Sequence, residues 1–175
     1  MTSGKTKPAE MAVRWLEDSN IAAAPVPVER IAKAKGAQLR FSPLDEAISG
    51  MVYIKEGTPI IGVNSLHHPN RQRFTIAHEC GHLALHKAEI TKEVHVDLGN
   101  PMLMRDTKSA TGTDRMEIEA NAFAAELLMP ATLLREQIAQ GPIDIDDEGA
   151  VGALAKMFRV STSAMRLRLG NLMMM

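Results

Sequence analysis

The sequence is poor in cysteine and in net charge. Its single cysteine, Cys80, excludes a disulfide within the chain and suits a reducing compartment. The 20 lysine and arginine residues are balanced by 21 aspartate and glutamate residues, which leaves a formal net charge of −1. A chain so close to neutrality has no overall electrostatic attraction to nucleic acid or to an anionic membrane.

Long apolar runs are also absent. No run approaches the roughly 18 apolar residues that a membrane-spanning helix needs, and the first residues are not followed by the apolar stretch of a secretory leader. The protein is therefore expected to be cytoplasmic and not to associate with a membrane. Its 175 residues are enough for one domain with a core of its own, with or without a small appendage.

The most informative motif is His78-Glu79-Cys80-Gly81-His82. On a helix its two histidines lie about 40° apart around the axis and ~6 Å apart along it, so both imidazoles can reach one metal ion. Glu79 lies about 100° from His78, where a general base for a metal-activated water belongs. The motif therefore predicts one Zn²⁺ ion per chain, with Mn²⁺ as the alternative, held by His78 and His82.

The helix that carries the motif is predicted to span about residues 70–86, with Asn70 as its N-cap. Apolar side chains surround nearly the whole helix, so we expect it to be buried. Buried imidazoles and a buried carboxylate need partners, which a metal ion and its water supply together. The alternative is a pair of hydrogen-bonded core histidines. Cys80 is interpreted as a core residue rather than a nucleophile or a ligand.

A catalytic zinc ion needs a third protein ligand and one open position. The best candidate is Glu117, a carboxylate on the apolar face of a second helix predicted over about residues 114–130. A buried salt bridge to an arginine is the alternative role for Glu117. Asn121 lies one turn later, where it could hydrogen-bond a ligating histidine.

Other polar residues near these motifs fit a metal site less well. His86 continues the histidine row, but it lies ~12 Å from His78 along the axis and is interpreted as a helix-end residue. Glu119 and Glu126 point away from the apolar face and are predicted to be solvated. Three further histidines are alternative ligands that no spacing favours: His67, His68 and His95.

Two sequence blocks resemble the ImmA/IrrE family of zinc metallopeptidases. They are RQRFTIAHECGHLALH at residues 71–86 and EIEANAFAAELLMP at residues 117–130. The resemblance implies that His78 and His82 bind zinc, that Glu79 is the general base, and that Glu117 is the third ligand in a thermolysin-like arrangement with Asn121. It also implies a protein substrate, an Xre-type helix-turn-helix repressor of a phage, mobile-element or stress regulon.

The expected fold is α+β, a mainly helical zincin-like catalytic domain over residues 1–142 with a small antiparallel sheet. Helical spacing marks residues 8–17 and 28–35, and strands are predicted at 38–41, 50–54 and 59–64. The last strand is either a sheet edge that holds an extended substrate or an ordinary inner strand. Residues 87–114 have weak periodicity and are predicted to form a mobile flap near the metal.

A helix-turn-helix-like segment is predicted over residues 143–175. Apolar positions on both sides of Arg159 indicate two helices, with Ser161 capping the second. DNA-binding versions prefer glycine where this chain has Arg159, so DNA binding is the least favoured of three roles. Docking of a protein partner and packing against the catalytic domain are the other two.

The predicted activity is that of a zinc-dependent endopeptidase. Glu79 would take a proton from the metal-activated water and deliver it to the leaving amine, and Tyr53 or His95 could donate to the oxyanion. Two other classes compete, a zinc-containing protein that sequesters a repressor without cutting it and a DNA-bound regulator. The intact Glu79 argues against the first, and the near-neutral charge argues against the second.

Overall fold

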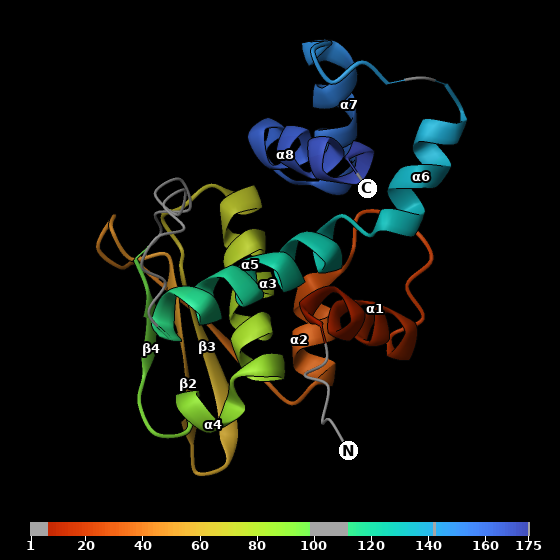
Figure 1. Cartoon of the computed structure of the whole chain (residues 1–175). Helices are drawn as coiled ribbons and strands as arrows, with labels where there is room; N and C mark the ends of the chain where they lie inside the picture. The colour runs from red at the N-terminus through yellow and green to blue at the C-terminus, as the bar shows by residue number, and fades with distance from the viewer. Residues whose placement is uncertain (1–6, 99–111, 142, 175) are drawn as a thin grey trace.

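The computed structural model describes residues 7–98, 112–141 and 143–174 and confirms the predicted α+β class. A small sheet lies on one side of a group of helices (Figure 1). The helices are α1 (Pro8–Asp18), α2 (Val28–Ala34), α3 (Pro69–Leu85), α4 (Lys87–Ile90), α5 (Gly112–Leu128), α6 (Ala131–Ala139), α7 (Glu148–Phe158) and α8 (Thr162–Met173). The strands are β1 (Gln38–Ser42), β2 (Gly50–Lys55), β3 (Thr58–Asn64) and β4 (His95–Asp97).

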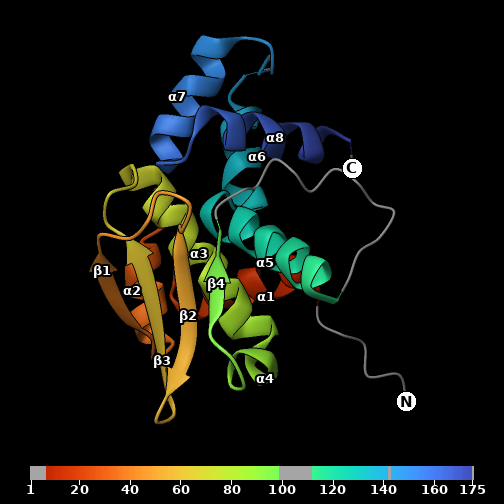
Figure 2. The same ribbon diagram turned by 90° about the vertical axis from the view of Figure 1, so that its left-hand side faces the viewer.

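The sheet is mixed, with the strand order β1-β3-β2-β4 (Figure 2). A two-residue turn joins β2 and β3, and its residues Glu56 and Gly57 both have positive φ, as tight hairpins require. β1 pairs with β3 in parallel, so the prediction of a wholly antiparallel sheet is wrong for this pair. The chain passes from β1 across one strand position to β2 and then turns back in the hairpin to β3, so β1 and β3 lie side by side and run in the same direction.

Only a strand at the edge of the sheet can pair with an extended substrate peptide. β3 lies between β1 and β2, so residues 59–64 form an inner strand and the edge-strand alternative is wrong. Among the described strands β4 lies at one edge of the sheet, where it pairs with β2. His95 of β4 stands opposite Val52, a fully buried residue on the helix-covered face of the sheet. The edge of the sheet therefore brings His95 to the side where the helices pack.

The central helix is α3, which packs between the sheet and α5 (Figures 1 and 2). Its N-cap is His68 and not Asn70, because the His68 ring accepts a hydrogen bond from the backbone N–H of Asn70 at 3.2 Å. Pro69 occupies the first helical turn, where a missing N–H costs nothing. α1 covers α5, with Trp15 edge-on to Phe123 at a ring-centroid distance of 5.2 Å.

The C-terminal helices α7 and α8 form the predicted helix-turn-helix shape. The Ser161 side chain accepts a hydrogen bond from the backbone N–H of Ala164 at 3.1 Å, which confirms the predicted cap. Arg159 ends α7 with φ 54°, a left-handed conformation that usually favours glycine. Phe158 and Met165 are fully buried in the hydrophobic cluster that also contains the core residues of α3 and α5. Packing is thus a demonstrated role of this segment, while the domain boundary at residue 142 remains a prediction.

A buried ion pair attaches α8 to the end of α5. Arg168 pairs with Glu126 and donates a hydrogen bond to the carbonyl of Met129 at 3.1 Å. Glu126 also accepts a hydrogen bond from the backbone N–H of Ala131 at 3.0 Å. The prediction that Glu126 is solvated is therefore wrong, because α8 covers a position that the helix pattern alone leaves open.

Removal of one partner of this pair should destabilise the protein. Arg168→Ala would leave the Glu126 carboxylate buried without its counter-charge, and we expect a loss of about 3 kcal/mol in the free energy of unfolding. The double variant Glu126→Gln/Arg168→Met should recover most of it. Urea unfolding of both proteins measures the difference, with Arg166→Ala as the control on the same helix. A loss in Arg168→Ala no larger than in the control would contradict a structural role for the pair.

The segment after α3 contains more structure than its sequence predicts. α4 and β4 lie within the residues predicted as a flap, and residues 99–111 of that stretch lie outside the described part of the chain. Among the described residues, no helix is both long enough and apolar enough to cross a membrane.

Candidate metal centre

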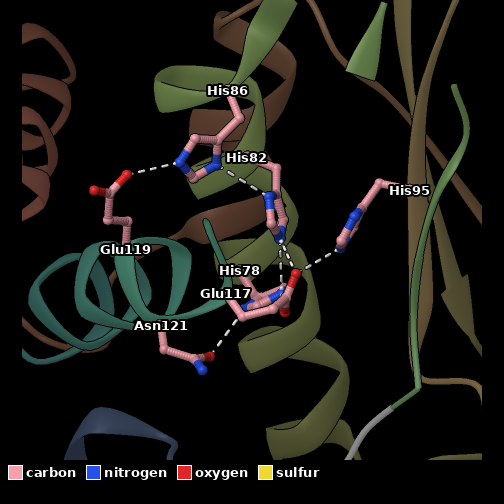
Figure 3. Close-up of polar contacts among 7 residues, drawn as sticks. All are labelled: His78, His82, His86, His95, Glu117, Glu119 and Asn121. Atoms are coloured by element: carbon pink, nitrogen blue, oxygen red, sulfur yellow. Dashed lines mark hydrogen bonds and ion pairs between the residues drawn. The ribbon is translucent and has the colours of Figure 1, made fainter. Parts of the chain in front are cut away.

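Side chains from α3, α5 and β4 converge beside the sheet (Figure 3). Glu117 of α5 reaches both histidines of the motif: its Oε2 lies 3.1 Å from His78 Nε2 and its Oε1 lies 3.2 Å from His82 Nε2. The two Nε2 atoms are 3.1 Å apart. The structure thus brings the three predicted ligands to one point.

His95 is the fourth member of this cluster. Its Nε2 lies 3.0 Å from Glu117 Oε1, and single ligand atoms of His78, His82, His95 and Glu117 all lie within 4.8 Å of one another. His95 is 17% exposed, whereas His82 is fully buried, so it stands on the open side of the centre. It is close enough to act as a fourth ligand or as a donor to substrate.

The remaining candidates lie elsewhere. Tyr53 pairs with Ile60 and alternates with Val52, so it lines the sheet face opposite to His95 and does not reach the cluster. His67 is within 3.2 Å of the carbonyl of Glu46, and His68 caps α3. Neither is a member of the metal-binding group. Alternation along β2, combined with the register between β2 and β4, places Tyr53 and His95 on opposite faces of the sheet. The sequence does not give that register.

Close packing of α3 against α5 places Glu117 within reach of the histidines. A Cβ atom on Gly81 would lie 2.9 Å from the Cα atom of Ala120 and 3.0 Å from its carbonyl oxygen. Real Cβ atoms essentially never come so close to backbone, so position 81 requires glycine at this separation. Small residues therefore set the distance between the two helices.

Asn121 orients His78. Its Oδ1 lies 2.9 Å from His78 Nδ1, so the ring donates from Nδ1 and holds its other nitrogen, Nε2, toward Glu117 and His82. A hydrogen bond on the remote nitrogen is how proteins fix the tautomer of a ligating histidine. The geometry gives Asn121 the position predicted for it.

The residues fit a divalent metal ion. Both carboxylate oxygens of Glu79 are buried without a hydrogen-bond partner, and so are His95 Nε2 and Glu117 Oε1. The close approach of the last two atoms lacks hydrogen-bond geometry. Buried polar atoms are normally satisfied, and a cation among two imidazoles and a carboxylate would satisfy these. Imidazole nitrogens and carboxylate oxygens are donors that several divalent metal ions accept.

The charged groups of the centre shift one another's pKa values. Burial opposes protonation of His78, but its hydrogen bond to Glu117 and the nearby Glu79 and Asp97 carboxylates outweigh burial and raise its pKa to about 9. Burial lowers the pKa of His82 to about 4. Burial would raise the pKa of Glu117, but its pairing with His78, His82 and His95 holds it well below its usual range. Binding of a divalent ion should therefore release a proton near neutral pH.

Glu79 should destabilise the metal-free protein at high pH. Burial raises the pKa of Glu79 to about 8 from an ordinary value of 4.5, and the carboxylates of Asp97 and Glu117 act in the same direction. Below pH 4.5 the group is neutral in both states, and its unfavourable ionisation develops as pH rises toward 8. Metal-free Glu79→Gln should thus be more stable than wild type above pH 8 by roughly 2–4 kcal/mol, with no difference near pH 4.

Urea unfolding of the metal-free proteins at both pH values tests this prediction, with the exposed Glu93→Gln as the matched control. A stability difference that is independent of pH would show that ionisation of Glu79 is not its cause.

Three residues next to the ligand cluster were not predicted to belong to the site: His86, Glu119 and Asp97. His86 Nδ1 lies 3.1 Å from His82 Nδ1, and Glu119 Oε2 lies 2.9 Å from His86 Nε2. Glu119 was predicted to be solvated; its side chain is 25% exposed, but it also reaches His86 because α5 packs against α3. Asp97 forms a second potential ligand group with His78 and Glu79.

Comparison with known proteins assigns the chain to a family. The sequence profile of the IrrE N-terminal-like domain, Peptidase_M78, matches residues 32–170. The chain belongs to this family. Its membership confirms the resemblance of the motif blocks and shows that the chain carries an IrrE-like metallopeptidase domain, for which the cluster supplies a divalent-metal site.

Similar proteins include two from Deinococcus. The radiation response metalloprotease IrrE of Deinococcus radiodurans is 36% identical over 110 residues, which cover 60% of this chain and 29% of that protein. The protein of the same name from Deinococcus deserti is 39% identical over 88 residues, which cover 47% of this chain and 27% of that protein. The chain therefore spans less than a third of the length of these curated relatives.

A solved structure shares the fold of this IrrE-like chain. A Mycobacterium tuberculosis transcriptional regulator superposes with a TM-score of 0.61 at 17% sequence identity, over 90% of this chain and 44% of the regulator. At this identity the likeness extends to the fold alone.

Proposed function

We propose that the protein is a zinc-dependent endopeptidase. The convergence of His78, His82 and Glu117 around one point, with the unpartnered Glu79 carboxylate buried beside them, carries this proposal. Two imidazoles and a carboxylate are the ligands of catalytic zinc in thermolysin-like enzymes, where the fourth position is left open. A structural zinc site would be closed by four protein ligands and would need no base.

The chemistry of the site follows from the placement of its side chains. A zinc ion in this site would supply Lewis acidity, which acidifies water and polarises a peptide carbonyl. Glu79 would accept the proton of the attacking water and later deliver it to the leaving amine. Burial raises the pKa of Glu79 to about 8 without a metal ion, and the positive charge of a bound zinc ion would favour the ionised carboxylate that the first transfer requires. His95, on the open side, would donate to the oxyanion rather than bind the metal.

The free edge of β4 is the proposed binding site for substrate. Within the described residues β4 pairs with β2 on one side only, and an extended peptide could add on the other. His95 faces the metal centre from this strand. Val96 is 41% exposed and its neighbours Val94 and Leu98 are also exposed, so this edge offers apolar contacts as well as backbone groups.

The proposed substrate is an Xre-type helix-turn-helix repressor, whose cleavage would derepress a phage, mobile-element or stress regulon. The family resemblance supports this choice, and the relatives named for a radiation response are consistent with a stress regulon. A compact repressor would have to expose an extended segment for the β4 edge. We expect the cut in a linker rather than in a folded helix.

Incubation of the purified protein with the Xre-type regulator encoded beside its gene tests the proposal. We expect two repressor fragments whose masses define one cut, formed with zinc and suppressed by a chelator. An intact repressor held in a stable complex would favour the sequestering protein instead. Salt-sensitive binding to duplex DNA with no effect on the repressor would favour the DNA-bound regulator.

A further inference from the structure

A chain of hydrogen bonds runs from the metal centre to the protein surface. It starts at His82 Nδ1, passes through both ring nitrogens of His86 at 3.1 and 2.9 Å, and reaches the Glu119 carboxylate (Figure 3). Glu119 Oε1 then accepts a hydrogen bond from Arg115 Nε at 2.8 Å. His82 and His86 are buried, Glu119 is 25% exposed and Arg115 is 63% exposed.

Only one arrangement of protons is compatible with metal binding by His82. To bind a metal through Nε2, neutral His82 must carry its proton on Nδ1 and donate it to His86 Nδ1. His86 must then accept at Nδ1 and carry its own proton on Nε2, which donates to Glu119. The carboxylate can only accept, so it fixes the direction of the whole chain. The hydrogen bonds from His86 and Arg115 hold the pKa of Glu119 below its ordinary value.

The backbone at the end of α3 positions the His86 ring within this chain of hydrogen bonds. His86 is the C-cap of α3, with φ −127° and ψ 32°, and its backbone N–H still donates to the carbonyl of His82 at 2.8 Å. Its ring can therefore turn back along the helix toward His82. Glu119 comes from α5, the helix that also supplies Glu117, so the chain joins the two metal-binding helices at a second point.

We propose that His86 and Glu119 are positioning residues, which hold His82 in the tautomer and orientation that bind the metal. His78 receives the same support directly from Asn121, whereas His82 receives it through one intervening imidazole. Outer partners of this kind typically strengthen metal binding by 10–100-fold. Both positions lie outside the metal-ligand cluster, so their variants leave every ligand in place. The inference rests on the proposed metal site and not on proteolysis.

Zinc dissociation constants, measured by competition with a chelator, test the proposal. We expect His86→Leu to weaken zinc binding by about 10–100-fold and Glu119→Ala by about 10-fold. His86→Gln can accept from His82 and donate to Glu119, so it should restore part of the affinity. Glu136→Gln on the exposed surface of α6 is the control for loss of one carboxylate and should match wild type.

The double variant separates a connected chain from two independent structural effects. In the His86→Leu background, Glu119→Ala should cause little further loss of zinc affinity, because its route to His82 is already broken. The visible absorption spectrum of the cobalt-loaded protein should shift in His86→Leu, which reports the altered ligand directly. The melting temperatures of the metal-free proteins show whether a loss of fold stability alone explains the loss of zinc affinity.

Three results would overturn the proposal: wild-type zinc affinity in Glu119→Ala, fully additive losses in the double variant, or loss of affinity only in proportion to a loss of metal-free stability. Failure of the wild-type protein to bind any divalent metal would be a different outcome, since it would remove the proposed function as well.

Discussion

Replacement of Glu79 by glutamine should reduce repressor cleavage by ~10² or more, the usual size of a general-base effect. Glutamine keeps the size and polarity of the side chain but cannot accept the proton of the attacking water. The loss should appear in kcat, because the group acts on the reacting atoms rather than on substrate binding. Rates of cleavage of the purified repressor, measured at saturating substrate, give the number.

Zinc content and repressor binding are the controls for this variant. Both should match wild type, since Glu79 is not a member of the ligand group formed by His78, His82, His95 and Glu117. In cells that produce the Glu79→Gln variant, the genes controlled by the repressor should stay repressed. Derepression equal to wild type in those cells would show that cleavage is not the function, and would favour sequestration.

Replacement of Glu117 by alanine should remove the metal as effectively as His82→Ala. Each change deletes one of three ligands, so we expect zinc affinity to fall by more than the 100-fold that outer partners can contribute. Metal content after dialysis and chelator competition measure the loss. Both variants should also lose proteolysis, and added zinc should restore it only at high concentration.

Glu119→Ala is the graded comparison for Glu117→Ala, since the two carboxylates lie two residues apart on α5. It removes a partner of His86 and no ligand, so its effect on zinc affinity should be the smaller by at least about 10-fold. If Glu117→Ala retained wild-type metal content, the third ligand would be His95, or the ion would lie in the second group, formed by His78, Glu79 and Asp97.

Local sequence patterns predicted the three side chains that converge at the candidate metal centre. The helical period places His78 and His82 on one face, and the same period puts Glu117 on an apolar face where a carboxylate needs a counter-charge. These features depend on residues within two turns of one another. The role of Asn121 was predicted from its spacing to Glu117, and in the structure its Oδ1 lies 2.9 Å from His78 Nδ1.

Features that depend on packing between distant segments were missed or left open. Glu119 and Glu126 look alike on a helical wheel, yet one reaches His86 and the other is covered by α8. The parallel pairing of β1 with β3 cannot be read from alternation, because alternation shows faces and not directions. His95 entered the site only because β4 extends the sheet by one strand toward α5.

A crystal structure of the zinc-loaded protein, with anomalous scattering to locate the ion, tests the central claim most directly. We predict one zinc ion bonded to Nε2 of His78, Nε2 of His82 and the Glu117 carboxylate, with a water in the fourth position beside Glu79 and with His95 unbound. A zinc ion closed by His95 as its fourth protein ligand, or an ion held by His78, Glu79 and Asp97 instead, would contradict the assignment of a catalytic centre.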